Sequence, residues 1–202
     1  MLKIAETFTS IQGEGHLTGK RMRFIRFAGC LVKQCPLHPS RSNLCDTDWS
    51  MREQSDPVIL ADDALNEVGS GGWVSITGGE PMDQPAGLER LIFELKRRSL
   101  LVNIQTSGTI WVTCPWDWLT VSPKGELVQT FGQEMKVVYT GQPDDELMEL
   151  YRNSKFWNYY VMPLWAEDGP NTADTIDAVH ALNKRGQPWE LTTQAHKYWS
   201  VR

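Results

Sequence analysis

The sequence predicts a single α/β domain whose parallel sheet forms an incomplete barrel or an open, curved sheet. Short apolar runs typical of strands alternate with segments of helical periodicity, which is the pattern of βαβ units. The expected strands outnumber the long helices, which favours an incomplete barrel over a closed one. The length of 202 residues suits one domain, residues 1–202, and no change of composition marks a linker.

The individual elements are predicted from side-chain periodicity and from helix-start and helix-stop residues. The clearest helix contains Leu88, Leu91, Ile92 and Leu95, which recur at helical spacing and form one apolar stripe. The predicted elements are, in order, strands over 3–11 and 22–28, a helix over 57–68, a strand over 73–77, the helix around 88–95, strands over 100–106, 118–122 and 135–140, a helix over 143–152, a strand over 159–164, a helix over 172–185 and a strand over 190–194.

Composition and charge argue against two classes of partner. The net charge of −5 comes without a basic stripe, so a nucleic-acid surface is not expected. No apolar run reaches the length of a membrane span, and the amino terminus lacks the apolar core of a signal peptide. Four cysteines, three of them close together, do not form the framework of a secreted disulfide-rich protein. We therefore expect a cytosolic protein whose thiols stay reduced.

Six unusual segments come directly after predicted strands. In parallel α/β folds the chemistry lies at the carboxyl ends of the strands, so we expect all six to share one edge of the sheet. Each alone is more often a turn than a site, but together they indicate a functional site. The segments are Gln12-Gly13-Glu14-Gly15, the cysteine loop over 29–50, Gly78-Gly79-Glu80-Pro81, Thr106-Ser107-Gly108-Thr109, Ser122-Pro123-Lys124 and Met162-Pro163-Leu164.

The cysteine loop carries Cys30, Cys35 and Cys45, and three interpretations compete for them. A structural zinc site would take His38 as its fourth ligand. The second interpretation is three free buried thiols. The third is a [4Fe–4S] cluster held at three irons, with the fourth iron open to a small-molecule ligand. The spacing Cys-x4-Cys-x9-Cys does not by itself decide between zinc and cluster.

Seven motifs in order resemble the 7-carboxy-7-deazaguanine synthases of the radical S-adenosylmethionine (SAM) superfamily. The resemblance runs from near residue 5 to the carboxyl terminus, and the ordered set is far more specific than any one motif. The motifs are Ser10-Ile11-Gln12-Gly13-Glu14-Gly15, Phe24-Ile25-Arg26-Phe27-Ala28-Gly29-Cys30, Cys45-Asp46-Thr47, Ile76-Thr77-Gly78-Gly79-Glu80-Pro81, Gln105-Thr106-Ser107-Gly108-Thr109, Val121-Ser122-Pro123-Lys124 and Gln194-Ala195-His196-Lys197-Tyr198.

The resemblance implies a modified, partial (β/α) barrel with reduced helix content. It also implies a [4Fe–4S] cluster, SAM and Mg²⁺ as cofactors, and an external electron donor. The implied reaction contracts the ring of 6-carboxy-5,6,7,8-tetrahydropterin to 7-carboxy-7-deazaguanine with loss of ammonia. A homodimer is the family expectation.

The resemblance also implies roles for individual residues. Cys30, Cys35 and Cys45 would hold the cluster, and Thr47 with Asp46 would contact Mg²⁺, a hard cation that prefers oxygen. Arg26 would pair with the substrate carboxylate. The residues that would line SAM are Leu44, Asp46, Gly79, Glu80, Ser107, Ser122, Pro123, Lys124, Met162 and Pro163. The residues that would face the pterin are Ile11, Gln12, Gly13, Glu14, Arg26, Thr77 and His196.

The sequence departs from the family pattern in the cysteine loop. The position three before Cys45 is Ser42, so the resemblance makes Cys35 the middle cluster ligand. Gln105 stands where the family often has a glutamate. Two alternatives remain open at this point, namely a radical-SAM activating enzyme for another substrate and a non-catalytic, zinc-stabilised binding module.

Overall fold

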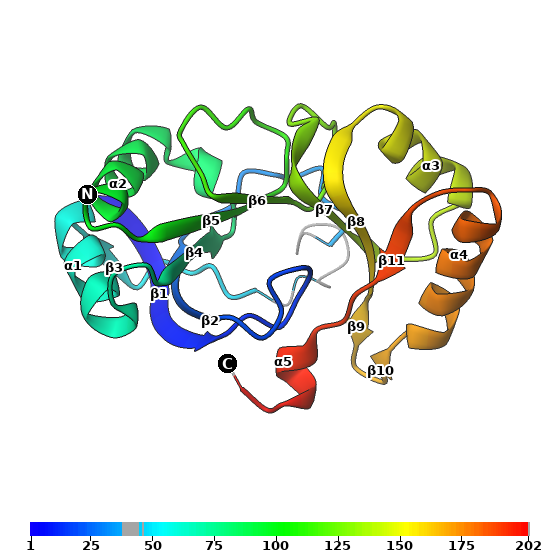
Figure 1. Ribbon diagram of the computed structural model, residues 1–202, viewed down its shortest axis with the longest axis horizontal. Coiled ribbons are helices and arrows are strands. Elements are labelled where there is room, and N and C mark those ends of the chain that lie inside the picture. The colour runs from blue at the N-terminus through cyan, green and yellow to red at the C-terminus, as the bar shows by residue number, and fades with distance from the viewer. Residues whose placement is uncertain (38–44, 46, 202) are drawn as a thin grey trace.

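The computed structural model describes residues 1–37, 45 and 47–201. Its main sheet has nine strands and curves into an open arc, with four helices on the outer side (Figure 1). From one edge to the other, the strands are β11 (Trp189–Leu191), β8 (Lys155–Pro163), β7 (Phe131–Tyr139), β6 (Trp118–Val121), β5 (Leu101–Thr106), β4 (Trp73–Gly78), β2 (Arg21–Phe27), β1 (Leu2–Ile11) and β3 (Glu53–Ser55). The predicted α/β fold with an incomplete barrel is confirmed.

The strands β2, β4, β5, β6, β7, β8 and β11 are parallel to one another. In contrast, β1 runs antiparallel to β2. Only residues 12–20 connect β1 with β2, and a parallel crossover needs a dozen or more residues. In the resulting register Ile11 pairs with Arg21, so the carboxyl end of β1 lies beside the amino end of β2. The expectation that all six segments share one edge is therefore wrong for the turn over 12–15. Figure 1 shows that this connection, in blue, folds into the concave side of the arc.

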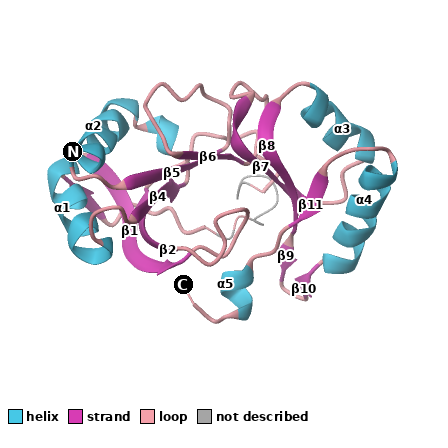
Figure 2. Cartoon of the chain, viewed as in Figure 1, coloured by secondary structure: helices cyan, strands magenta, loops and turns pink. Residues whose placement is uncertain are grey.

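The helices cover the two ends of the arc and leave its middle to loops (Figure 2). The loops over 107–117 and 122–130 flank β6, which confirms the expected reduction in helix content. The helices are α1 (Pro57–Val68), α2 (Pro85–Arg97), α3 (Asp144–Arg152), α4 (Thr172–Lys184) and the short α5 (Ala195–Tyr198), with a 3₁₀ turn, η1, at Pro81–Asp83. None of the described helices is long and apolar enough to cross a membrane.

Four short elements escape the sequence prediction. These are β3, α5 and the small hairpin of β9 (Trp165–Ala166) and β10 (Gly169–Pro170). They contain two to four residues each, which is too few to show a periodicity. β7 and β8 also begin four residues earlier than predicted, at Phe131 and Lys155.

The two faces of each parallel strand differ in polarity. Successive side chains of a strand point to opposite faces, so Met135 and Val137 of β7 join the core beneath the helices. The side chains that alternate with them, Glu134 and Lys136, are buried on the concave side. The same alternation places Gln105 on the concave side and Ile104 in the core. A packed apolar layer thus supports a polar concave surface.

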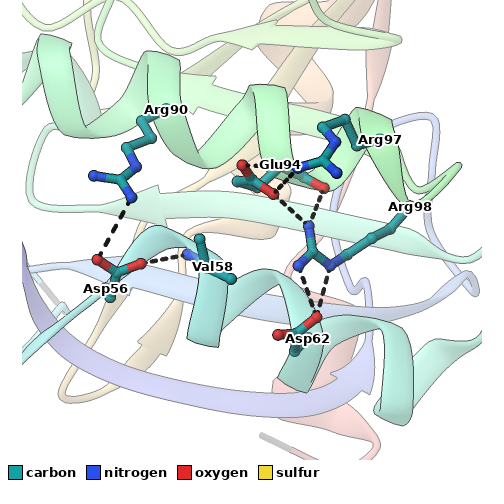
Figure 3. A network of polar contacts seen from close by, with 7 residues as sticks. All are labelled: Asp56, Val58, Asp62, Arg90, Glu94, Arg97 and Arg98. Atoms are coloured by element: carbon teal, nitrogen blue, oxygen red, sulfur yellow. Dashed lines mark hydrogen bonds and ion pairs between the residues drawn. The ribbon is translucent and has the colours of Figure 1, made fainter.

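The outer helices α1 and α2 are joined by a polar network (Figure 3). Arg98 donates from Nη1 to Glu94 at 2.6 Å and approaches Asp62 at 2.7 Å through Nη2. Arg90 lies 3.9 Å from Asp56, whose carboxylate also caps the first turn of α1. Arg98 therefore joins α2 to α1 away from the cavity, whereas its neighbour Lys96 pairs with Asp117.

Candidate functional site

An open cavity of about 340 Å³ lies on the concave side of the sheet. It is lined by the turn after β1, the cysteine loop, the ends of the parallel strands and the carboxyl-terminal segment. The predicted site residues that line it are Ile11, Gln12, Gly13, Glu14, Arg26, Cys30, Cys35, Cys45, Thr47, Thr77, Gly79, Ser107, Ser122, Lys124, Met162, Pro163 and His196. Segments that lie at opposite ends of the strands thus meet in one cavity.

The three clustered cysteines are free thiols on the wall of this cavity. Burial, together with the smaller effect of the nearby carboxylates of Asp83 and Glu80, raises the pKa of Cys30 to about 11. Beside Cys30, the backbones of Gly29 and Gly79 lie in close contact. A Cβ added at Gly79 would come within 1.8 Å of the Gly29 carbonyl oxygen, so only glycine fits there.

The donor set matches an iron–sulfur cluster in the type of its ligands. Three thiols that face one cavity suit iron or zinc, and thiolates form when a metal displaces their protons. Among the described residues, no three His, Cys, Asp or Glu side chains are close enough together to hold a metal ion. His38, Leu44 and Asp46 lie outside the described residues, so the zinc alternative and these two SAM or Mg²⁺ assignments stay predictions.

Glu80 and Pro123 are the predicted SAM-lining residues, among those described, that do not line the cavity. The Glu80 side chain is buried beneath the Gly78–Pro81 turn, where it accepts hydrogen bonds from three groups. The donors are the Thr106 hydroxyl at 2.7 Å, the Ser107 N–H at 2.7 Å and the Met82 N–H at 3.1 Å. Glu80 therefore ties the end of β4 to the end of β5.

Arg26 lies near the carboxyl end of β2 and faces the cavity. Its Nε donates to the Glu6 carboxylate of the neighbouring strand β1 at 2.8 Å. The side chains of both residues are about four-fifths buried. Thr77 is the direct neighbour of Arg26 on β4. A guanidinium held on one side by a carboxylate is fixed in orientation, which suits it for recognising an anion.

The turn after β1 contributes a second charged group, Glu14. Its carboxylate accepts hydrogen bonds from Lys136 of β7 and, at 3.1 Å, from the side-chain amide of Gln194. The Gln12 side-chain oxygen accepts from the Glu14 backbone N–H at 3.1 Å. The turn is thus tied to the sheet and to the carboxyl-terminal segment.

The carboxyl-terminal segment lies directly on this turn. The Ala195 N–H donates to the Gly13 carbonyl oxygen at 2.8 Å. A Cβ added at Gly13 would lie 2.4 Å from His196 Nδ1, so the contact depends on glycine. His196 accordingly lies beside the turn at the cavity wall.

The sequence analysis missed two charged residues on the concave surface, Lys136 and Glu134. The Glu134 carboxylate accepts from the His16 N–H at 3.0 Å and from the Trp118 indole N–H at 3.4 Å. Burial raises the pKa of Glu134. A signal was available, because Glu134 and Lys136 alternate with the apolar Met135 and Val137 within one strand.

The cavity combines two kinds of chemistry. One part carries thiols that suit a soft metal, and the other carries amide, carboxylate and guanidinium groups that suit a polar heterocycle with an acidic substituent. A redox-active group and a small polar ligand could therefore lie next to each other. The cavity is of the size typical of small-molecule sites.

Comparison with known proteins identifies relatives over the full length of the chain. The chain is 35% identical, over 209 residues that cover all of both sequences, to the 7-carboxy-7-deazaguanine synthase of Bacteroides thetaiotaomicron. The crystal structure of QueE from Escherichia coli matches it with a TM-score of 0.68, at 24% identity, over 96% of this chain and 94% of that one. Streptococcus suis SuiB bound to S-adenosylmethionine matches with a TM-score of 0.52, at 14% identity, over 79% of this chain and 47% of that one. No protein-family model matches the chain.

Proposed function

The chain belongs to the 7-carboxy-7-deazaguanine synthase family of radical SAM enzymes, and we propose that it converts 6-carboxy-5,6,7,8-tetrahydropterin to 7-carboxy-7-deazaguanine with loss of ammonia. The observation that carries this proposal is the 35% identity to a named synthase over the whole of both chains. The cavity supports it, because thiols and polar groups suited to the pterin line the same space.

Under this proposal, Cys30, Cys35 and Cys45 would hold a [4Fe–4S] cluster, and SAM would bind beside it. Gly79, Ser107, Ser122, Lys124, Met162 and Pro163 line the SAM site, and Thr47 contacts Mg²⁺. When bound, the cluster and SAM supply the radical that abstracts hydrogen from the substrate. SuiB, which shares the fold and binds S-adenosylmethionine, supports the assignment of SAM as a ligand.

The protein's own residues hold the cofactor loops in place and shield the reaction. Glu80 connects the turn after β4 with the start of the loop after β5, because its carboxylate accepts hydrogen bonds from the Thr106 hydroxyl and the Ser107 N–H. Gly79 lets that turn lie directly on Gly29, next to Cys30. Glu80 therefore acts by positioning the SAM-binding backbone.

The polar part of the cavity binds the pterin. The pyrimidine edge of a pterin presents adjacent N–H donors and a carbonyl acceptor, which match the carboxylate of Glu14 and the amide of Gln12. Arg26 binds the substrate carboxylate, and its orientation is fixed by Glu6. His196 and the carboxyl-terminal segment cover the ring from the side of Gly13.

Anaerobic turnover tests the proposed function. The reconstituted enzyme, mixed with SAM, dithionite, Mg²⁺ and 6-carboxy-5,6,7,8-tetrahydropterin, should form 7-carboxy-7-deazaguanine, detected by mass spectrometry. The product should be absent when either SAM or the reductant is omitted. Failure to form the deazapurine with an iron-loaded enzyme would overturn the proposal.

We also propose that the enzyme works as a homodimer, accepts electrons from an external donor and lies in the cytosol. Family membership supports these assignments. Light scattering of the reconstituted enzyme at micromolar concentration should give twice the mass of the 23.0 kDa chain. A mass of one chain would contradict the dimer.

A further inference from the structure

A buried lysine joins three distant segments at the polar end of the cavity. The Lys136 side chain is 4% exposed and donates to the carboxylate of Glu14, which is 15% exposed. Gln194 approaches the other oxygen of that carboxylate at 3.1 Å. The sheet, the turn after β1 and the carboxyl-terminal segment therefore converge on one carboxylate.

Two buried carboxylates, Glu14 and Glu134, lie near Lys136, and their pKa shifts indicate which of them Lys136 stabilises more in its ionised form. Burial alone would raise the pKa of Glu14, but Lys136, Gln194 and His196 bring it below its ordinary value. Burial raises the pKa of Glu134, which Lys136 offsets only in part. The surroundings thus favour the ionised form of Glu14 more than that of Glu134.

A buried ion pair is an expensive way to stabilise a fold. Removing two charges from water costs several kcal/mol per ion, and apolar side chains of the same size often stabilise a protein as well. Two pairs elsewhere differ in their setting. Lys96 and Asp117 have side chains about one-third exposed, and the buried pair of Arg98 with Glu94 lies on the outer helices, away from the cavity. Lys136 and Glu14 are both buried and both line the cavity, which indicates a role in binding.

We propose that Lys136 is a positioning residue that fixes the Glu14 carboxylate toward the 2-amino-4-oxo-pyrimidine edge of the pterin. This inference rests on the proposed function, because that function supplies the ligand. A carboxylate can accept hydrogen bonds from two adjacent N–H groups at once only if its plane is held in place. Lys136 holds one oxygen from the sheet, and Gln194 holds the other from the carboxyl-terminal segment.

Substitution of Lys136 should separate pterin binding from SAM binding. With the iron-loaded Lys136→Met enzyme we expect the KM for the pterin to rise about tenfold or more, as for a misplaced pair of charge-assisted hydrogen bonds. The KM for SAM should not change. Lys136→Arg keeps the charge and should restore much of the pterin affinity. Lys155→Met, at the exposed start of the neighbouring strand β8, is the matched control and should behave as wild type.

A double variant shows whether Lys136 acts through Glu14. If it does, Glu14→Gln alone should weaken binding, and adding Lys136→Met should change the pterin KM by less than about twofold. A further tenfold loss in the double variant would mean that Lys136 contacts the ring directly and would overturn the positioning role. The double variant also leaves neither Glu14 nor Lys136 as a lone buried charge, so it keeps the test available if Lys136→Met alone does not fold.

Binding of the product tests the inference without turnover. Titration of the iron-loaded enzyme with 7-carboxy-7-deazaguanine, which carries the same 2-amino-4-oxo-pyrimidine edge, should give a Kd that rises at least tenfold in Lys136→Met, as expected for the same hydrogen bonds. Equal Kd values for a catalytically competent wild type and the variant would overturn the inference and leave the proposed function intact. A wild type that makes no deazapurine would overturn the proposed function itself.

Discussion

Individual side chains of the cavity divide into groups that would bind a ligand and groups that hold those binders in place. Cys30 and Glu14 line the cavity and carry the chemistry of the two proposed ligands. Glu80 and Gln194 act on the backbone or the side chain of such residues through short hydrogen bonds. The second group is as necessary as the first, because a ligand-binding group is effective only in a fixed orientation.

Replacement of Cys35 tests the middle cluster ligand. We expect Cys35→Ala, reconstituted anaerobically, to lose most of its iron, its labile sulfide and its visible absorption, because two thiolates hold a [4Fe–4S] cluster poorly. Cys114→Ala is the matched control. Cys114 is also a buried free thiol, but it packs in the core and should leave the cluster unchanged. An unaltered iron content in Cys35→Ala would show that another residue is the third ligand.

Glu134 gives a prediction for pH. Burial raises its pKa above the ordinary value of 4.5, so its contribution to stability is fully present below that pH and is lost as pH rises through the folded value. Glu134→Gln keeps an acceptor oxygen and removes the titration. The urea midpoint of the wild type minus that of the variant should fall as pH increases from 4.5 to 8. A difference that stays constant, or rises, would contradict the assigned direction of the shift.

The residues that the sequence predicted and those that it missed differ in how local their signals are. Cys30, Gly79 and Arg26 lie in motifs whose neighbours identify them, and the structure places all three on the cavity wall. Lys136 lies in a strand that was predicted over 135–140 without use of its alternation of polar and apolar residues. Its partner Glu14 lies 122 residues away in the chain, and only the fold brings them together.

Among the elements, β1 decides where the polar end of the cavity lies. Because β1 is antiparallel to β2, the turn after it starts at the opposite edge from the cysteine loop and reaches the same cavity from the other side. The length of the connection over 12–20 was visible in the sequence and predicts this direction. The docking of α5 on the turn was not predictable, since it depends on contacts between residues near opposite ends of the chain.

Gly13→Ala tests the contact between the turn and the carboxyl-terminal segment. The added methyl group would lie 2.5 Å from the His196 backbone nitrogen, so the segment must move away. We expect faster proteolytic cleavage after residue 192 and a several-fold higher KM for the pterin, as is typical when a positioning element moves by about 1 Å. The KM for SAM, whose proposed site lies at the other edge, should stay near the wild-type value. Unchanged proteolysis would show that the segment is held elsewhere.

On the scale of the whole molecule, an open arc of strands gives one small chain a concave side with room for the two proposed ligands. The helices α1, α2, α3 and α4 back the ends of the arc, and loops around β6 replace the central helices (Figure 2). The sequence predicted this architecture, because the expected strands outnumbered the long helices and the apolar stripe of α2 was clear. The small elements β3, β9 and β10 contain only two or three residues each and left no periodic signal.

The central claim is that the two ends of this one cavity hold SAM and the pterin side by side. A crystal structure of the reconstituted enzyme with SAM and 7-carboxy-7-deazaguanine tests it most directly. We predict a cluster on Cys30, Cys35 and Cys45, SAM along Gly79, and the product's pyrimidine edge within hydrogen-bond distance of the Glu14 carboxylate. A product bound outside the cavity, or a cluster on other residues, would contradict the account.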